Sequence, residues 1–340
     1  MSHDISLAER EEENLASLQQ QFLALVDDKL EATEVVFRRY LESDVPFIDS
    51  AGDYIASSGG KRVRPALLLL ASRLLGHDGE EEITYAAVIE FIHTASLVHD
   101  DIIDHATLRR GAASVNELWG NSRTVLLGDW IYTTAMKMAL VHNNLEVIRR
   151  LCEATLKMIE GELWTLERLG SIDISVEEYF EITERKTAHL FAAAASIPSL
   201  IAPSSNGAGA ALHTYGRQLG TCFQLVDDLL DFTASEDELG KPVLTDLREG
   251  KLTLPLILVL NRSGAKEKGL VEKVLEDRSF DRVGPDQILE LVHSAGTLDE
   301  VEAMARARAE EARRVLDIFP AVPARFALEY APEYILRRRF

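Results

Sequence analysis

Two acidic triplets with the same spacing, DDxxD, interrupt apolar stretches of this 340-residue chain. Their members are Asp100, Asp101, Asp104, Asp227, Asp228 and Asp231. On a helix, residues three or four positions apart share one face, so each triplet concentrates like charges that repel one another. A cation relieves that repulsion, and carboxylate oxygens suit Mg²⁺, which completes its shell with water and phosphate oxygens. The triplets therefore predict two acidic walls that bind Mg²⁺ together with a phosphate compound.

Acidic triplets also occur on solvated helix faces, where they bind nothing. Here the flanking residues, in ASLVHDDIID and CFQLVDDLLDF, are mostly apolar. Such neighbours are not typical of a solvated face, and they occur twice in this chain. We therefore expect both triplets to line one cavity, and we keep a helical protein with two solvated acidic faces as the alternative.

Basic residues flank both acidic stretches, although the chain as a whole is acidic. It has 36 Lys and Arg against 56 Asp and Glu, a net charge of −20. One basic cluster lies in the turn GGKRVRP before a predicted helix, where free backbone N–H groups favour an anion. The basic residues concerned are Lys61, Arg62, Arg64, Arg109, Arg110, Lys186, Lys241 and Lys251. Their position beside the carboxylates predicts a phosphate bridged by Mg²⁺ and held by Arg and Lys.

Three further polar residues accompany these groups. His93 precedes Asp100 by seven residues, about two helical turns, and Gln224 precedes Asp227 by three. Thr187 directly follows Lys186. A lone His or Lys is commonly an ordinary core or surface residue, so spacing alone leaves the function of each open.

The composition excludes several classes of function. The acidity argues against a nucleic-acid-binding surface and against a polybasic membrane anchor. The longest apolar stretches fall short of the roughly 20 residues that span a bilayer, and the N-terminal segment lacks the apolar core of a secretory signal. With two cysteines and no metal-ligand spacing between them, we expect a cytoplasmic protein without a disulfide framework.

Helices must position all of these residues, because Ala, Leu and Glu are abundant and no alternating strand pattern occurs. The predicted helices cover 7–43, a short stretch ending at 57–60, a stretch from 64, then 81–107, 123–142, 144–169, 175–196 and 207–233, followed by a loop over 234–252 and C-terminal helices from 254. This pattern predicts one all-α domain over 1–340, with an N-terminal helix (1–43), a catalytic core (44–260) and C-terminal helices (261–340).

Taken together, the motifs resemble those of the trans-polyprenyl diphosphate synthase family, the polyprenyl synthetases. The likeness runs from about residue 45 to residue 260 and includes GGKRVRP, EFIHTASLVHDDIIDHATLRRG, GDWIY, ERKTAHLF, CFQLVDDLLDF and GKPVLTDLREGKLTLP. It implies an isoprenoid-synthase helical bundle around a central cavity, usually a homodimer. It also implies a trans-prenyltransferase that condenses an allylic diphosphate, such as farnesyl diphosphate, with isopentenyl diphosphate.

The resemblance assigns a role to each candidate residue. All six aspartates would hold two or three Mg²⁺ ions with the substrate diphosphate. Isopentenyl diphosphate would contact Lys61, Arg64, His93 and Arg110. The allylic diphosphate would contact Arg109, Lys186, Thr187, Gln224, Lys241 and Lys251, of which Lys186, Thr187 and Gln224 would also act at the reacting carbon. Arg62 lies in the same turn but is less often credited with substrate contact, and the basic ArgArgArgPhe end would close over the second substrate.

Product length in this family depends on the space upstream of the first triplet. Ala95 lies five residues before Asp100, where members with short products often carry a bulky aromatic residue, and Ser96 and Ile92 lie nearby. The small side chain of Ala95 predicts a long product of about seven to ten isoprene units (C35–C50), used for a quinone side chain. Candidates for the tunnel floor are Met136, Met138 and Leu151.

Three alternative enzymes or subunits stay open on the sequence. One is a shorter-chain farnesyl or geranylgeranyl diphosphate synthase, and another is a non-catalytic subunit of a heteromeric prenyl synthase. A terpene cyclase is the third, but the repeated DDxxD and the intact GGKRVRP weigh against it.

Overall fold

The computed structural model describes residues 23–109, 111–202, 207–234 and 243–337. Its helices are α2 (Asp27–Leu41), α3 (Pro46–Ser57), α4 (Val63–Leu74), α5 (Glu81–Ile103), α6 (Val115–Trp119), α7 (Asn121–Ala139), α8 (Leu145–Glu167), α9 (Val176–Thr183), α10 (His189–Ser196), α11 (Pro198–Ile201), α12 (Ala208–Thr233), α14 (Thr245–Arg248), α15 (Leu254–Leu260), α16 (Ala265–Asp277), α17 (Pro285–Ala295), α18 (Thr297–Val315) and α19 (Pro323–Arg337). Short helical turns η1 (Leu140–His142), η2 (Glu184–Ala188) and η3 (Leu316–Ile318) extend or join them. The all-α prediction is confirmed.

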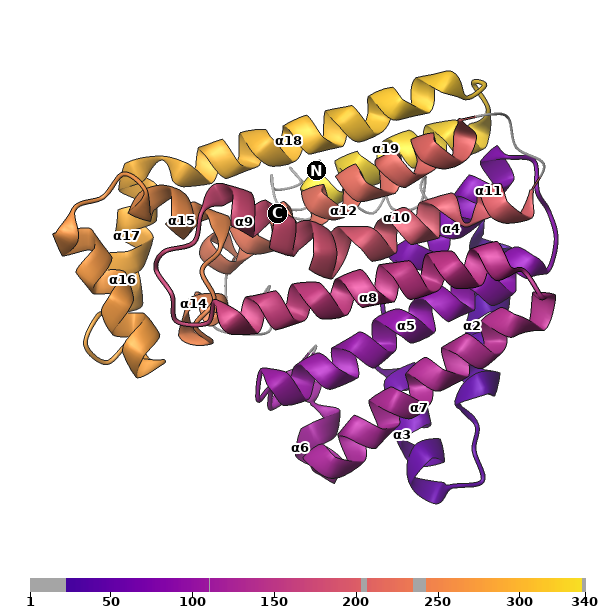
Figure 1. Cartoon of the computed structure of the whole chain (residues 1–340), viewed down its shortest axis with the longest axis horizontal. Coiled ribbons are helices and arrows are strands. Elements are labelled where there is room, and N and C mark those ends of the chain that lie inside the picture. The colour runs from indigo at the N-terminus through magenta and orange to yellow at the C-terminus, as the bar shows by residue number, and fades with distance from the viewer. Residues whose placement is uncertain (1–22, 110, 203–206, 235–242, 338–340) are drawn as a thin grey trace, which may run out of the picture.

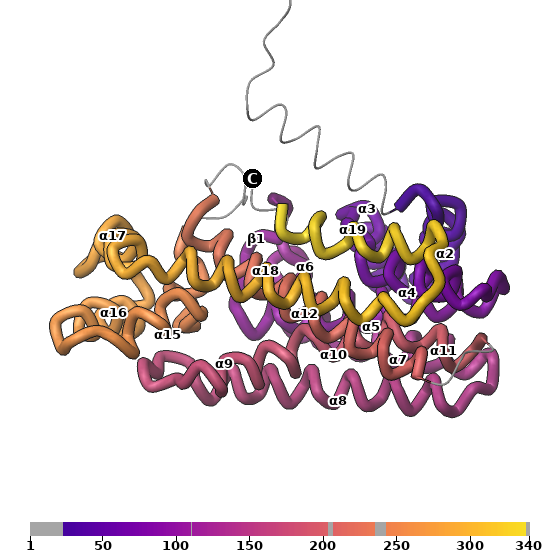
Figure 2. Tube along the Cα trace, turned by 90° about the horizontal axis from the view of Figure 1, so that it is seen from above, coloured from indigo at the N-terminus to yellow at the C-terminus, as the bar shows by residue number. Residues whose placement is uncertain are grey.

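The long helices run roughly along the long axis of the molecule and lie side by side across it (Figure 1). α18 packs against α12, α12 against α10, and α10 against α8, whereas α5 pairs with α7. Seen from above, α8 and α9 run along one edge of the molecule (Figure 2). The core lies where α4, α5, α10 and α12 meet, and it includes the fully buried runs 66–71 and 193–195. Among the described residues, no helix combines the length and the apolarity needed to cross a bilayer.

The long helix that carries the first triplet ends earlier than predicted. It starts at Glu81 as expected but stops at Ile103 instead of about Thr107. His105 adopts a left-handed backbone conformation with φ +52°, and the Ala106 amide donates to the Asp101 carbonyl at 2.9 Å. This is a Schellman-type helix end, normally signalled by glycine, which is absent at this position.

A short hairpin follows and corrects the expectation that the chain has no strand. β1 (Leu108–Arg109) pairs antiparallel with β2 (Ala112–Ala113), and Gly111 supplies φ +77° in the turn. The hairpin holds Arg109 beside the end of α5.

The predicted helix over 175–196 is continuous but contains an irregular turn. Ser175 and Glu178 form a capping box at its start, and the segment η2 is a π-helical turn between α9 and α10. Such turns are frequent at functional sites. Lys186 and Thr187 lie in this turn, so the bulge sets the direction of two candidate catalytic side chains.

Glycines let the neighbouring helices approach this turn closely. A Cβ atom at Gly161 of α8 would lie 2.6 Å from the Lys186 backbone nitrogen. A Cβ atom at Gly220 of α12 would lie 2.7 Å from the Ala188 Cα atom. The π-helical turn is therefore held between two helix backbones.

The predicted first helix and the loop after α12 are only partly described. α2 covers the C-terminal half of the predicted helix over 7–43, and residues 1–22 lie outside the described part of the chain. The loop over 234–252 contains the short helix α14, and its residues 235–242 also lie outside. The division of the domain at residues 43 and 260 stays a prediction.

Candidate active site

A cavity of about 610 Å³ opens between α5, α7, α8, η2 and α12. The predicted site residues that line it are Arg64, Ile92, His93, Ala95, Ser96, Asp100, Arg109, Lys186, Thr187, Gln224 and Asp227. The structure thus brings the first aspartate of each triplet, three basic side chains and the chain-length positions to one hollow.

The first aspartates of the two triplets lie at the polar end of this cavity. Burial raises the pKa of Asp100 to about 6, and the Lys186 ammonium offsets part of that increase. The Lys186 ammonium also forms an ion pair with Glu162 of α8. The cavity therefore holds a partly desolvated carboxylate beside a cation, an arrangement that favours binding of a metal and an anion together.

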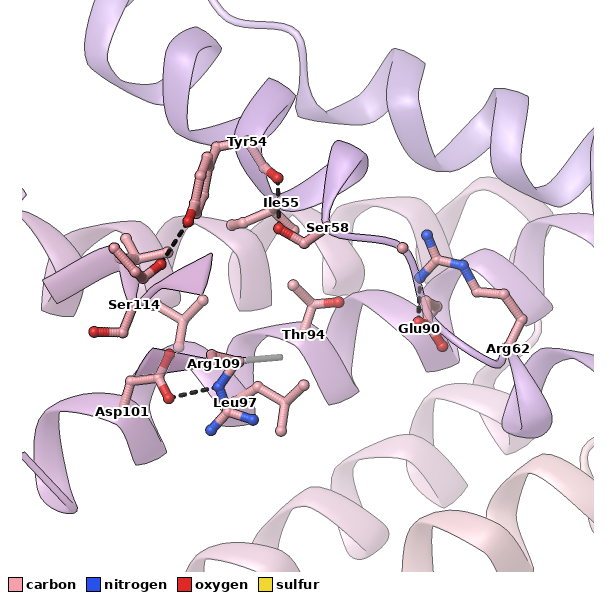
Figure 3. Close-up of a pocket in the computed structure, with 14 residues that line it drawn as sticks. Tyr54, Ile55, Ser58, Arg62, Glu90, Thr94, Leu97, Asp101, Arg109 and Ser114 are labelled. Atoms are coloured by element: carbon pink, nitrogen blue, oxygen red, sulfur yellow. Dashed lines mark hydrogen bonds and ion pairs between the residues drawn. The ribbon is translucent and has the colours of Figure 1, made fainter. Parts of the chain in front are cut away.

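The second aspartates of the triplets do not line this cavity but border two smaller pockets next to it. Asp101 is 1% exposed, and the Arg109 Nε atom donates to its Oδ1 atom at 2.5 Å. This pair borders a pocket of about 60 Å³ (Figure 3), and Arg109 also lines the main cavity. Successive residues on a helix are about 100° apart around its axis, so Asp100 and Asp101 do not share a face.

Asp228 of the second triplet is also buried and has protein partners on both oxygens. Tyr179 of α9 donates its hydroxyl to Oδ2 at 2.6 Å, and Gln224 donates its Nε2 to Oδ1 at 2.9 Å. Thr187 in turn donates its hydroxyl to the Gln224 Oε1 atom at 2.9 Å. Burial and the charge of nearby Asp246 raise the pKa of Asp228 to about 7.

The third aspartates also have protein partners. Asp231 is 1% exposed and accepts from the backbone amides of Thr245 and Asp246, at 3.1 and 3.3 Å, so it caps the start of α14. Asp104 accepts from the Lys251 ammonium at 2.7 Å. The sequence prediction placed all six aspartates on metal ions, whereas only Asp100 and Asp227 line the cavity.

Lys251 ties the end of α5 to the segment after α14. Its ammonium contacts Glu249 at 3.0 Å as well as Asp104. Burial alone would lower the pKa of Lys251, but these two carboxylates raise it above its usual range. The side chain lines a second pocket of about 160 Å³ that shares Lys186, Thr187 and Gln224 with the main cavity.

The basic turn GGKRVRP divides its side chains between different roles. Arg64 reaches the main cavity and stacks on Phe191, with its guanidinium carbon 4.4 Å from the ring centre. Lys61 is exposed. Arg62 forms ion pairs with Glu34 and Glu90 and has φ +47°, so it anchors the turn.

Some predicted residues lie outside the described part of the chain. These are Arg110, Lys241 and residues 338–340 of the basic C-terminal end. Arg337, the described residue of that end, forms an ion pair with Glu333 at 2.6 Å.

Apolar side chains line part of the cavity. They include Ile92 and Ala95 of α5 and Met158 of α8, beside Tyr132 of α7 and Thr155 of α8. None of the three predicted floor residues Met136, Met138 and Leu151 lines the cavity, and Met138 and Leu151 are fully buried in the core. Their apolar type indicated burial correctly, but the helix faces on which they lie point elsewhere.

Sequence reasoning missed Glu162, Tyr179 and Gly161. Each lies on α8 or α9, without a recognisable motif, and becomes important only because α8 and α9 pack against η2. Gly161 did carry a signal, because a glycine inside a strongly helical stretch commonly has a packing reason.

The residues present fit Mg²⁺ that arrives with a phosphate ligand. Within the described ranges, no three His, Cys, Asp or Glu side chains converge to make a complete metal site. Mg²⁺ typically needs only one or two carboxylates, because water and substrate phosphate complete its octahedron. Asp100 and Asp227, facing the same cavity with basic residues beside them, are a donor set of this kind.

The cavity combines carboxylates and cations with apolar side chains, a combination that suits a phosphate group attached to a hydrocarbon chain. A family model of polyprenyl synthetases matches residues 45–292. The octaprenyl diphosphate synthase of Escherichia coli is 40% identical over 288 residues, which cover 85% of this chain and 89% of that protein.

Solved structures agree with this match. A polyprenyl synthase from Caulobacter crescentus, complexed with calcium and isoprenyl diphosphate, superposes with a TM-score of 0.90 at 34% identity and covers 95% of this chain and 98% of its own. A decaprenyl diphosphate synthase from Rhodobacter capsulatus gives 0.89 at 31% identity, with 94% and 99% covered. The chain belongs to the polyprenyl synthetase family and is a trans-prenyltransferase, as the sequence motifs predicted.

Proposed function

We propose that the cavity condenses an allylic diphosphate, such as farnesyl diphosphate, with successive molecules of isopentenyl diphosphate. The observation that carries the proposal is that Asp100 and Asp227, from triplets far apart in the sequence, line one cavity with Lys186, Thr187 and Gln224. The diphosphate groups would lie at this polar end, and the hydrocarbon tail would extend past Ala95 and Ile92.

Asp100 and Asp227 are the proposed Mg²⁺ ligands, with Asp104 near them at the end of α5. When bound, Mg²⁺ supplies charge stabilisation for the departing diphosphate. Lys186 and Arg109 add fixed positive charge at the same end of the cavity. Arg64 and His93, which both line the cavity, would hold isopentenyl diphosphate together with Lys61 and Arg110.

The proposed reaction starts when the C–O bond of the allylic diphosphate breaks and both electrons leave with the diphosphate. The double bond of isopentenyl diphosphate attacks the allylic carbon, and a new C–C bond forms. A proton then leaves the neighbouring carbon for the departed diphosphate. The oxygens of Thr187 and Gln224, which line the cavity, stabilise the positive charge on the allylic carbon.

The proposed product has about seven to ten isoprene units and serves as a quinone side chain. Ala95 supports a long product, because it lines the cavity with only a methyl side chain. A shorter product of the farnesyl or geranylgeranyl type is the alternative.

The proposed active form is a homodimer in the cytoplasm. Leu156, Ile159, Leu163 and Leu166 recur on α8 at intervals of three and four residues, and all four are exposed, although the last three also line the main cavity. Such an apolar stripe on a helix is typical of a buried interface. Both cysteines are free, as expected in a reducing compartment.

The test is to incubate the purified chain with farnesyl diphosphate, labelled isopentenyl diphosphate and Mg²⁺, and to identify the products by mass. The expected result is labelled polyprenyl diphosphate of C35–C50. A terpene cyclase would incorporate no label, and a non-catalytic subunit would become active only after a second protein is added. Label at C15 or C20 alone would favour the short-chain alternative.

A further inference from the structure

The second aspartate of the second triplet has a role that the DDxxD pattern does not suggest. Asp228 is 2% exposed and does not line the main cavity. Its two oxygens accept from Tyr179 and from Gln224, at 2.6 and 2.9 Å. We propose that Asp228, held by Tyr179, is a positioning residue that orients the Gln224 amide and, through it, the Thr187 hydroxyl toward the reacting carbon. This inference rests on the proposed function of the same cavity.

The orientation follows from which groups can donate. A glutamine side chain has a donor end and an acceptor end, and a carboxylate oxygen only accepts. Asp228 therefore selects the amide NH₂ of Gln224 and turns its Oε1 atom toward Thr187. The Thr187 hydroxyl donates to that Oε1 atom at 2.9 Å, so the hydrogen of the hydroxyl points away from the substrate.

What remains toward the cavity is oxygen lone pairs. Thr187 and Gln224 both line the main cavity, and the chain of hydrogen bonds directs their partial negative charges there. Fixed dipoles aimed at a developing charge stabilise it without reorganisation during the reaction. A reversed amide would present N–H groups to a carbocation and oppose its formation.

The arrangement does not depend on whether Asp228 is charged. A proton on Oδ2 would let the tyrosine hydroxyl accept instead of donate, and Oδ1 would still accept from the Gln224 amide. The first triplet is built in a comparable way, because Asp101 is buried and holds Arg109 by an ion pair at 2.5 Å. In both triplets, then, the residue after the cavity-lining aspartate binds a protein group.

The experiment compares binding of two ligands in the presence of Mg²⁺. One is an allylic diphosphate, and the other is an analogue in which a protonated nitrogen replaces the reacting carbon. Asp228→Leu, which removes both acceptor oxygens, is expected to reduce the preference for the cationic analogue by about 10- to 100-fold, and Tyr179→Phe by about 3- to 10-fold, as expected when oriented dipoles are lost. The control is Tyr215→Phe. Tyr215 lies on α12, the helix of Gln224 and Asp228, and its buried hydroxyl donates to the Leu328 carbonyl at 2.6 Å.

Two results would overturn the proposal. One is an unchanged preference in both Asp228→Leu and Tyr179→Phe. The other is an increase in the Mg²⁺ concentration for half-maximal binding in Asp228→Leu as large as that caused by Asp227→Asn, which would make Asp228 a metal ligand. If Asp228→Leu does not fold, Tyr179→Phe alone decides the matter.

Steady-state kinetics separates this inference from the proposed function. If the wild-type chain fails to incorporate isopentenyl diphosphate but still prefers the cationic analogue, the proposed reaction fails and the orientation stands. In an active enzyme, Asp228→Leu should lower kcat with less than about a twofold change in KM. The same substitution in a Gln224→Leu background should then cost little more, because the two residues act as one unit.

Discussion

Gly161 of α8 lies where the structure leaves no room for a side chain. A Cβ atom at this position would lie 2.6 Å from the Lys186 backbone nitrogen, 2.9 Å from the Arg185 Cβ atom and 3.0 Å from the Lys186 Cα atom. Two of these neighbours are backbone atoms of the π-helical turn, so no side-chain rotation relieves the contact. We expect Gly161→Ala to push this turn away from α8.

Two opposing contributions determine how much Gly161→Ala changes the free energy of unfolding. Overpacking of this kind costs about 1–3 kcal/mol, whereas alanine in place of glycine inside a helix contributes about 1 kcal/mol. The net loss in the free energy of unfolding should be about 0–2 kcal/mol. The activity should fall more, because the backbones must separate by roughly 0.8 Å to reach ordinary contact, and a displacement near 1 Å at a reacting group costs about 100-fold. We expect kcat to fall about 10- to 100-fold.

Gly269→Ala is the matched control, since Gly269 also lies inside a helix but has no atom within 4 Å of the added Cβ position. It should increase stability by up to about 1 kcal/mol and leave kcat unchanged. Urea denaturation measures the free energy of unfolding, and incorporation of labelled isopentenyl diphosphate measures the rate. If Gly161→Ala behaves like Gly269→Ala in both assays, the tight packing of α8 against the catalytic turn does not position Lys186 and Thr187.

Three further predictions address the cavity and the surface. Ala95→Tyr should fill the apolar end and shorten the product, seen by mass analysis; an unchanged chain length would contradict the assignment of this end to the tail. Burial raises the pKa of Asp100 to about 6, above its usual 3.8, so the metal-free fold should lose stability as the pH rises from about 4 to 6. Asp100→Asn should remove about 2–3 kcal/mol of this pH dependence, measured by urea denaturation. An equal change of stability with pH in both proteins would refute this. Leu156→Glu on the apolar stripe of α8 should produce a monomer in analytical ultracentrifugation, whereas Ile318→Glu, at an equally exposed apolar position on η3, should not; a Leu156→Glu protein that stays dimeric would place the interface elsewhere.

The long helices were predictable from the sequence because their ends carry strong local signals. Glycines at positions 59, 76 and 207 adopt left-handed conformations at element boundaries, and prolines 46 and 65 lie in first turns. Between such signals, apolar residues at helical spacing continue without interruption, as in α12. Local chemistry was sufficient for these elements, so their bounds agree with the prediction within a few residues.

The exceptions arise where tertiary contacts determine the backbone. His105 ends α5 in a left-handed conformation without the usual glycine, and the ion pair of Arg109 with buried Asp101 lies beside it. The π-helical turn at Glu184–Ala188 has no sequence signature of its own, and it is explained only by the close approach of the backbones at Gly161 and Gly220. No pattern within one segment predicts either feature.

The candidate site could be located from the sequence, but the partner of each of its side chains could not be predicted. Helical spacing correctly indicates that residues i and i+4 lie together, yet it says nothing about which partner each side chain meets. Asp231 bonds to the backbone amides of α14, and Asp228 bonds to a tyrosine of α9, 49 residues away in the chain. These partners come from other elements, so only the packed fold identifies them.

This arrangement changes how substitutions in the triplets should be interpreted. Loss of activity in any of the six variants agrees with a motif made entirely of metal ligands, so activity alone does not test that view. In the structure, Asp100 and Asp227 face the cavity, Asp101 holds a cation, Asp228 holds the Gln224 amide and Asp231 caps a helix. Only variants of Asp100 and Asp227 should strongly raise the Mg²⁺ concentration that the enzyme needs for activity. Asp231→Asn should instead act on the start of α14, because the side chain that caps it can no longer accept from both backbone amides.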